Sequence, residues 1–210
     1  MSEPADLLRV IELVCARLCH DTAGPIGTVH QALELARMDI PAGNEALGLA
    51  RQAAGDVGAR LKLFRAAWGM EAAACSVWAV RDLCAGLPGA GRVTFDWSGL
   101  PGGTVFAPAM ARVVLNVLLL AHDSLPRSGS VQVAGGARDV FVVIDGPGAA
   151  WPAGLVACLA DPSAALAAFS TPRDVQMPLT ALLARCLGLR LSLLMPVAGG
   201  GPAPLRLSAP

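Results

Sequence analysis

The chain has no excess of charge of either sign. Its 16 lysine and arginine residues balance 16 aspartate and glutamate residues, so the formal net charge at pH 7 is zero. The basic residues also form no long stripe along the sequence. Because DNA and RNA attract proteins through concentrated positive charge, we expect no direct contact with nucleic acid.

The sequence also lacks long hydrophobic runs, although hydrophobic residues make up 54% of it. A helix that crosses a bilayer needs about 20 consecutive apolar residues, and the longest apolar runs fall well short of that. Residues 1–6 are polar and acidic, whereas a secretory signal begins with positive charge followed by an apolar core. These features predict a soluble, cytoplasmic protein that does not contact a membrane.

No two cysteines have the two-residue spacing of a zinc finger. The six cysteines lie mostly in apolar periodic segments, so we expect reduced thiols in the core; they are Cys15, Cys19, Cys75, Cys84, Cys158 and Cys186. Cys15 and Cys19 precede His20, but a haem attachment signal needs a two-residue spacer and three residues separate this pair. We therefore expect no bound metal or cofactor.

Two long helices are predicted in the first part of the chain. Between residues 4 and 38 apolar residues recur every three or four positions on both sides of Pro25, so the proline is expected to kink this helix and not to end it. After a turn at residues 40–43, Asn44 is expected to cap a second helix. The apolar residues form a stripe on the first helix (Leu8, Ile11, Cys15, Leu18, Ile26, Val29, Leu33, Ala36) and a heptad seam on the second (Leu47, Ala50, Ala54, Val57, Leu61, Phe64, Trp68).

A tight turn between these helices requires them to pack antiparallel, but one hairpin cannot cover the apolar faces of both. Dimerisation into a four-helix bundle would cover them. We therefore predict that residues 1–71 form a dimerisation hairpin and that the protein is a homodimer.

Residues 72–210 have the pattern of an α+β domain. Strands are expected at residues 93–97, 104–106, 131–134, 140–144, 189–195 and 204–208, and helices at 108–125 and 179–187. Strands 131–134 and 140–144 should form a hairpin around Gly135 and Gly136. The predicted fold class is thus an α+β protein, in which a helical hairpin precedes an α/β sandwich with helices over one face of a mixed sheet.

The segment 18–26 carries the most specific chemistry: His20, then Asp21, then Pro25 five residues after the histidine. A lone histidine on an amphipathic helix is usually a boundary residue. Here Leu18 marks the inward stripe, and at about 100° per residue His20 points outward. A neutral imidazole offers a lone pair that can attack phosphorus, and an exposed helix position admits a partner's aspartyl phosphate. Asp21 is expected to orient or polarise the imidazole.

The run from Leu13 to Asp21, followed by residues 24–27, resembles the ChpT-type histidine phosphotransferases. Residues 173–176 and 183–191 extend the resemblance over nearly the whole chain. It implies a dimerisation hairpin like that of sensor histidine kinases, followed by a domain that resembles the kinase ATP-binding fold but no longer binds nucleotide. Members of that family take phosphate from the receiver domain of a hybrid histidine kinase and pass it to receiver domains of response regulators. One such acceptor is a cell-cycle transcription factor.

The resemblance also assigns roles to residues. It implies that His20 is the phosphoacceptor, Asp21 its acidic neighbour, Arg17 a contact to phosphate or partner, and Pro25 the helix kink. Thr22 and Ala23 depart from the family pattern and are expected to touch the partner. Mg²⁺ is expected to come with the receiver domain, whose acidic pocket holds it.

Two other functions remain open from the sequence: a divergent ATP-dependent histidine kinase and a non-catalytic adaptor that docks receiver domains. Asn116 lies where a kinase places a metal-binding asparagine, and residues 145–148 imitate an adenine-binding loop. However, residues 118–120 are leucines where a kinase needs polar groups, and no glycine-rich lid precedes Leu179 to cradle phosphates. Asn116 and Asp145 are therefore interpreted as fold remnants. The presence of His20 and Asp21 together argues against a pure adaptor.

Two further histidines are weaker candidates. His122 and Asp123 repeat the dipeptide, but Pro126 follows after four residues and ends the helix, so His122 is expected at the surface. His30 lacks an acidic neighbour.

Overall fold

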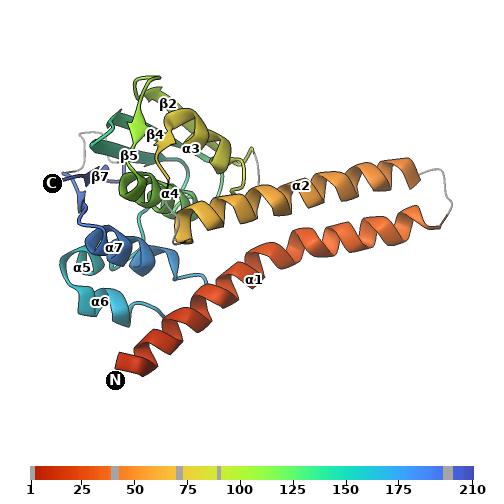
Figure 1. Cartoon of the computed structure of the whole chain (residues 1–210), viewed down its shortest axis with the longest axis horizontal. Coiled ribbons are helices and arrows are strands. Elements are labelled where there is room, and N and C mark those ends of the chain that lie inside the picture. The colour runs from red at the N-terminus through yellow and green to blue at the C-terminus, as the bar shows by residue number, and fades with distance from the viewer. Residues whose placement is uncertain (1–2, 39–42, 70–72, 89–90, 196–200) are drawn as a thin grey trace.

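The computed structural model describes residues 3–38, 43–69, 73–88, 91–195 and 201–210. A long helical hairpin precedes a domain of helices and strands (Figure 1), which confirms the predicted α+β fold class. The expected domain boundary, between residues 71 and 72, and residues 40–42 of the expected turn lie outside the described residues. None of the described helices has the length and apolarity needed to span a bilayer.

The hairpin consists of α1 (Glu3–Ala36) and α2 (Gly43–Trp68), which run antiparallel (Figure 1). As predicted, α1 continues through Pro25, and Figure 1 shows it bent but unbroken. The predicted cap at Asn44 is wrong, because α2 already begins at Gly43. Asn44 lies inside the first turn, where Glu45 supplies the negative charge that a helix start favours.

The two helices of the hairpin approach each other through small side chains. Ala32 of α1 and Ala46, Ala50 and Ala53 of α2 are buried. Most large apolar residues of the predicted stripes are instead half-exposed in the single chain, namely Leu8, Ile11, Ile26, Leu33, Leu47 and Leu61. A chain on its own thus leaves a long apolar surface uncovered.

The second domain is built on a five-stranded sheet in the order β2-β4-β5-β7-β6. β2 and β4 are parallel and the other neighbours are antiparallel. The strands are β2 (Val93–Gly99), β4 (Gly129–Gly136), β5 (Asp139–Asp145), β6 (Arg190–Leu193) and β7 (Leu205–Ser208). The hairpin between β4 and β5 occurs as predicted, but its turn lies at residues 137–138, because Gly136 pairs with Asp139. A short pair, β1 (Cys75–Ser76) with β3 (Val105–Phe106), lies apart from this sheet.

The longest helix of this domain is α4 (Pro108–Asp123), which is buried along most of its length and packs on β4 and β5. Alternate residues of these strands, such as Val131 and Val142, are buried, so one face of the sheet carries the core. α7 (Gln176–Cys186) corresponds to the helix expected at residues 179–187 and begins three residues earlier. Three short helices were not predicted: α3 (Val77–Cys84), α5 (Leu155–Ala160) and α6 (Pro162–Ala167).

The hairpin is anchored in this core. Leu63, Phe64 and Ala67, near the end of α2, belong to the same buried cluster as α4 and the sheet, and Leu18 of α1 packs against that cluster. The middle of α1 is therefore held beside the second domain.

Candidate functional site

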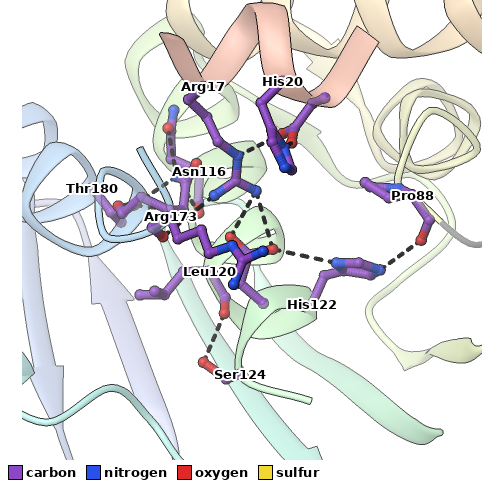
Figure 2. Close-up of polar contacts among 12 residues, drawn as sticks. Arg17, His20, Pro88, Asn116, Leu120, His122, Ser124, Arg173 and Thr180 are labelled. Atoms are coloured by element: carbon purple, nitrogen blue, oxygen red, sulfur yellow. Dashed lines mark hydrogen bonds and ion pairs between the residues drawn. The ribbon is translucent and has the colours of Figure 1, made fainter. Parts of the chain in front are cut away.

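His20 lies on α1 with its imidazole toward solvent, as its helical phase predicts. Its side chain is 62% exposed, and its Nδ1 lies 3.0 Å from Oδ1 of Asp21 (Figure 2). Among the described residues, Nε2 has no such partner. When Nδ1–H donates to the carboxylate, the neutral ring keeps its lone pair on Nε2. The nitrogen that has no hydrogen-bond partner is then the nucleophilic one.

Asp21 is held from two sides. One carboxylate oxygen faces His20, and Oδ2 accepts a hydrogen bond of 2.5 Å from Nε of Arg17, one turn earlier on α1. The Asp21 side chain is only 9% exposed. Adjacent side chains on a helix diverge and do not normally meet. The Arg17 contact therefore helps to hold the Asp21 carboxylate where it can reach His20.

Pro25 acts on the same turn through the backbone. Proline has no N–H, so the carbonyl of Asp21, four residues earlier, receives no helical hydrogen bond from it. Nη1 of Arg60, on α2, donates to that carbonyl instead. Nε of Arg60 also donates to the carbonyl of Gly86, at 3.4 Å. The carbonyl that the proline leaves unpaired thus fastens α1 to α2 beside His20.

Arg17 links α1 to the second domain. Its Nη2 donates to both carboxylate oxygens of Asp123, at 3.0 and 3.3 Å, and its Nη1 donates to the carbonyl of Arg173 at 3.4 Å (Figure 2). Burial disfavours the charge of Arg17, but the carboxylates of Asp123 and Asp21 outweigh burial and raise its pKa. Arg17 was expected to contact phosphate or a partner. That contact stays a prediction; in the single chain Arg17 is 8% exposed and is bound by acceptors of its own chain.

Thr22 and Ala23 occupy the next turn of α1. The Thr22 hydroxyl donates to the carbonyl of Leu18 at 2.9 Å, so it is turned toward the helix backbone. Ala23 is exposed. The contact of both residues with a partner stays a prediction, and Ala23 is the more accessible of the two.

A cleft separates His20 from the second domain. It has a volume of about 330 Å³ and is lined by Arg17, His20, Asp21, Pro88, His122, Asp123 and Arg173. The cleft thus brings together the predicted phosphoacceptor of α1, the carboxyl end of α4 and the segment that precedes α7. Of its second-domain residues, His122 and Asp123 form the repeated dipeptide and Arg173 belongs to a segment that carries the family resemblance; none of the three was predicted to be part of this site.

Residues 77–197, more than half of the chain, match the family model of the histidine phosphotransferase C-terminal domain. The chain belongs to this family. The protein phosphotransferase ChpT of Brucella abortus (strain 2308) is 30% identical over 139 residues, which are 63% of this chain and 65% of the Brucella protein. The match therefore spans less than two thirds of that relative's length. These findings confirm the ChpT-type resemblance.

A solved structure of a bacterial phosphotransferase matches the histidine phosphotransferase fold described above. Its TM-score is 0.71 at 22% sequence identity, and the match covers 100% of this chain and 98% of the other. The likeness extends over the hairpin and the second domain together, and at this identity it concerns the fold.

The histidine phosphotransferase domain buries the asparagine that a kinase would use for metal binding. Asn116 is 0% exposed. Its Nδ2 donates to the carbonyls of Ala67 and Arg112 at 2.8 and 2.9 Å. Its Oδ1 accepts from Nε1 of Trp68 at 3.2 Å and from Nε2 of Gln176 at 3.0 Å. With every polar position occupied by protein, the amide joins α2, α4 and α7.

His122 does not lie at the surface, so that prediction is wrong. It is 4% exposed, and its Nε2 lies 2.9 Å from the carbonyl of Pro88 and 3.0 Å from Nη2 of Arg92. Its Nδ1 has no hydrogen-bond partner among the described residues and lies 3.5 Å from Oδ1 of Asp123. Pro126 does follow the helix end, but Pro88 and Arg92 cover that end.

The cysteines divide by exposure. Cys84 and Cys158 are buried, and burial raises the pKa of the Cys84 thiol to about 12. Cys15, Cys19 and Cys186 are exposed, so the prediction of core thiols is wrong for these three. In the described part of the chain, no three histidine, cysteine or acidic side chains are grouped as a metal site requires.

Proposed function

We propose that this protein is a histidine phosphotransferase of a bacterial phosphorelay. His20 accepts a phosphoryl group from the receiver domain of a hybrid histidine kinase and passes it to the receiver domains of response regulators. The proposal rests on the exposed imidazole of His20, whose Nδ1 faces Asp21 and whose Nε2 has no hydrogen-bond partner among the described residues. Family membership and the likeness to ChpT support it. By the same resemblance, one acceptor is a cell-cycle regulator.

In the first transfer, the Nε2 lone pair of His20 attacks the phosphorus of the receiver's aspartyl phosphate. The bond from phosphorus to the aspartyl oxygen breaks as the N–P bond forms, and the receiver's carboxylate leaves with the electron pair. The imidazole ring becomes positively charged, and the Asp21 carboxylate at Nδ1–H stabilises that charge. The second transfer reverses these steps on another receiver, so the relay needs no ATP at this protein.

Mg²⁺ enters this proposal with the receiver, and the chain itself binds no cofactor. The two carboxylates that line the cleft with His20 support this division of roles, because Asp21 and Asp123 are both paired with Arg17. A carboxylate that is neutralised by a guanidinium is a poor ligand for a cation.

The protein works as a cytoplasmic homodimer in this proposal, without membrane or nucleic-acid contacts. The half-exposed leucines and isoleucines of α1 and α2 support a second copy of the hairpin as the partner. A four-helix bundle buries such stripes and leaves His20 on the outside, where a receiver domain can reach it.

An ATP-dependent kinase remains the main alternative, and nucleotide binding separates it from the phosphotransferase. Asn116 is locked in the core, and Leu118, Leu119 and Leu120 are buried beside it. Calorimetry with Mg²⁺ and ATP should therefore detect no binding. Saturation at micromolar nucleotide would favour the kinase.

A transfer assay tests the proposal against both the kinase and the adaptor. A receiver domain that carries radiolabelled phosphate is mixed with the protein, and label on the protein is followed over time. The wild type should become labelled, His20→Ala should not, and His30→Ala, an exposed histidine on the same helix, should behave as wild type. Asp21→Asn should slow the transfer. Label on His20→Ala, or none on the wild type with any receiver that binds it, would reject the proposal.

A further inference from the structure

Asp123 belongs to a row of contacts that begins at the exposed imidazole and ends inside the second domain. His20 meets Asp21, Asp21 meets Arg17, and Arg17 meets Asp123 (Figure 2). Asp123 lies 106 residues from Arg17 in the sequence and comes from the last turn of α4. The row therefore connects the predicted phosphoacceptor to a different domain.

The guanidinium of Arg17 needs this second carboxylate to stay in place. Only Nε donates to Asp21. Nη2 donates to the two carboxylate oxygens of Asp123, and Nη1 donates to the carbonyl of Arg173. A planar guanidinium that is hydrogen-bonded along two of its edges is held in one orientation. Without Asp123, only the weak 3.4 Å contact would remain on the outer edge, and Arg17 could turn away from Asp21.

Asp123 has a firm base of its own. It follows the fully buried segment from Val113 to His122, and the Nδ1 of His122 lies 3.5 Å from its Oδ1. The carboxylate is partly exposed, at 26% of the side chain, and lines the same cleft as His20, but its hydrogen bonds are with Arg17. Its observed contacts reach the imidazole through Arg17 and Asp21.

We propose that Asp123 is a positioning residue for phosphotransfer: by holding Arg17, it keeps the Asp21 carboxylate on Nδ1 of His20 and so leaves the lone pair on Nε2. This inference rests on the proposed function of His20. In this proposal the second domain fixes the tautomer of a histidine on the hairpin, a role for which it needs no nucleotide.

The tautomer of His20 can be measured without any receiver domain. In ¹⁵N-labelled protein at a pH where the ring is neutral, long-range ¹H–¹⁵N NMR spectra distinguish the Nδ1–H form from the Nε2–H form. We expect the wild type to be mainly Nδ1–H and Asp123→Asn, which keeps the size of the side chain, to shift toward Nε2–H. Asp82→Asn, the same change at an exposed residue of α3, should leave the tautomer unchanged.

The transfer rate gives the second measurement. Asp123→Asn should slow single-turnover transfer on the order of tenfold, because the reacting nitrogen is less often the unprotonated one. If Asp123 acts through Arg17, then adding Asp123→Asn to Arg17→Met should change neither the tautomer nor the rate further. Arg17→Lys removes the guanidinium that bonds both carboxylates, so it should shift the His20 tautomer toward Nε2–H in the same way. This variant tests the inference if Asp123→Asn folds poorly.

Three results would overturn the inference: an unchanged tautomer in both Asp123→Asn and Arg17→Lys, slower transfer with an unchanged tautomer, or a full additional effect of Asp123→Asn in the Arg17→Met background. The second result would mean that Asp123 contacts the partner directly. Failure of the wild type to accept phosphate would defeat the proposed function, whereas the tautomer measurement would still decide whether Asp123 orients His20.

Discussion

Replacement of Asn116 by alanine tests whether this residue is a structural joint or part of an active nucleotide site. The change removes two hydrogen bonds donated by Nδ2 and two accepted by Oδ1, at donor to acceptor distances between 2.8 and 3.2 Å. Because Asn116 is fully buried, water cannot easily replace them. The variant should loosen the joint between α2, α4 and α7.

The magnitude follows from the contacts that survive. Four hydrogen bonds at about 1 kcal/mol each give about 4 kcal/mol. The carbonyl of Ala67 still accepts from Arg112 at 3.2 Å, and Gln176 still donates to Thr180 at 2.9 Å. Those remaining partners reduce the expected loss to about 3 kcal/mol, which corresponds to a fall in Tm of roughly 6–12 °C for a chain of this size.

Thermal unfolding followed by circular dichroism measures this loss, at one fixed protein concentration because association would shift Tm. Asn44→Ala is the matched control, since Asn44 is exposed in the first turn of α2 and should cost less than about 1 kcal/mol. A Tm of Asn116→Ala within about 2 °C of the wild type would show that Asn116 does not hold these helices together and would make it a candidate for ligand binding.

Four further predictions concern other parts of the molecule. His122→Ala should lower the free energy of unfolding by about 1–3 kcal/mol in denaturant titration, because a buried ring and its polar contacts are lost; an unchanged midpoint would mean that the site tolerates the cavity. Arg60→Met should lower the free energy of unfolding, because the Asp21 carbonyl loses its donor. In a Pro25→Ala background, where residue 25 has an N–H that can donate to this carbonyl, the same change should lower it less. Equal losses in the two backgrounds would contradict the pairing of Arg60 with the Asp21 carbonyl. Cys84 should resist a thiol reagent at pH 8 in the native protein, since its pKa of about 12 keeps it protonated, while Cys15, Cys19 and Cys186 react; rapid labelling at Cys84 would show that the core opens there. Leu61→Glu should shift the mass measured by light scattering from that of two chains toward that of a single chain, because it places a charge in the apolar seam. A wild-type monomer at micromolar concentration would rule out the four-helix bundle.

The sequence predicts the helices and strands whose hydrophobic pattern repeats over many residues. α1, α2 and α4 repeat their apolar period over several turns, and β4 and β5 alternate in register, so each appears near its expected position. α5 and α6 have six residues each, which is less than two turns and too short for a period to be recognised. The start of α2 at Gly43 shows that a good capping residue does not by itself fix a helix boundary.

The same division holds for the candidate site. His20, Asp21 and Pro25 lie within one segment of six residues, so their spacing on a helix could be interpreted from sequence alone. Arg60 and Asp123 reach that segment only through the packing of α2 and α4, and no local pattern indicates such contacts. Asp123 did stand out as part of a repeated dipeptide, but its partner is Arg17 and its neighbouring histidine is buried.

NMR of the phosphorylated protein can show whether Nε2 of His20 is the atom that carries the phosphoryl group. Protein labelled with ¹⁵N at histidine is phosphorylated by a receiver domain, and the ¹⁵N and ³¹P signals are assigned to residue and ring position. We expect a single phosphohistidine, at Nε2 of His20, with Nδ1 protonated against Asp21. A phosphoryl group on Nδ1 of His20, on His30 or on His122 would show that Nε2 of His20 is not the phosphorylated atom.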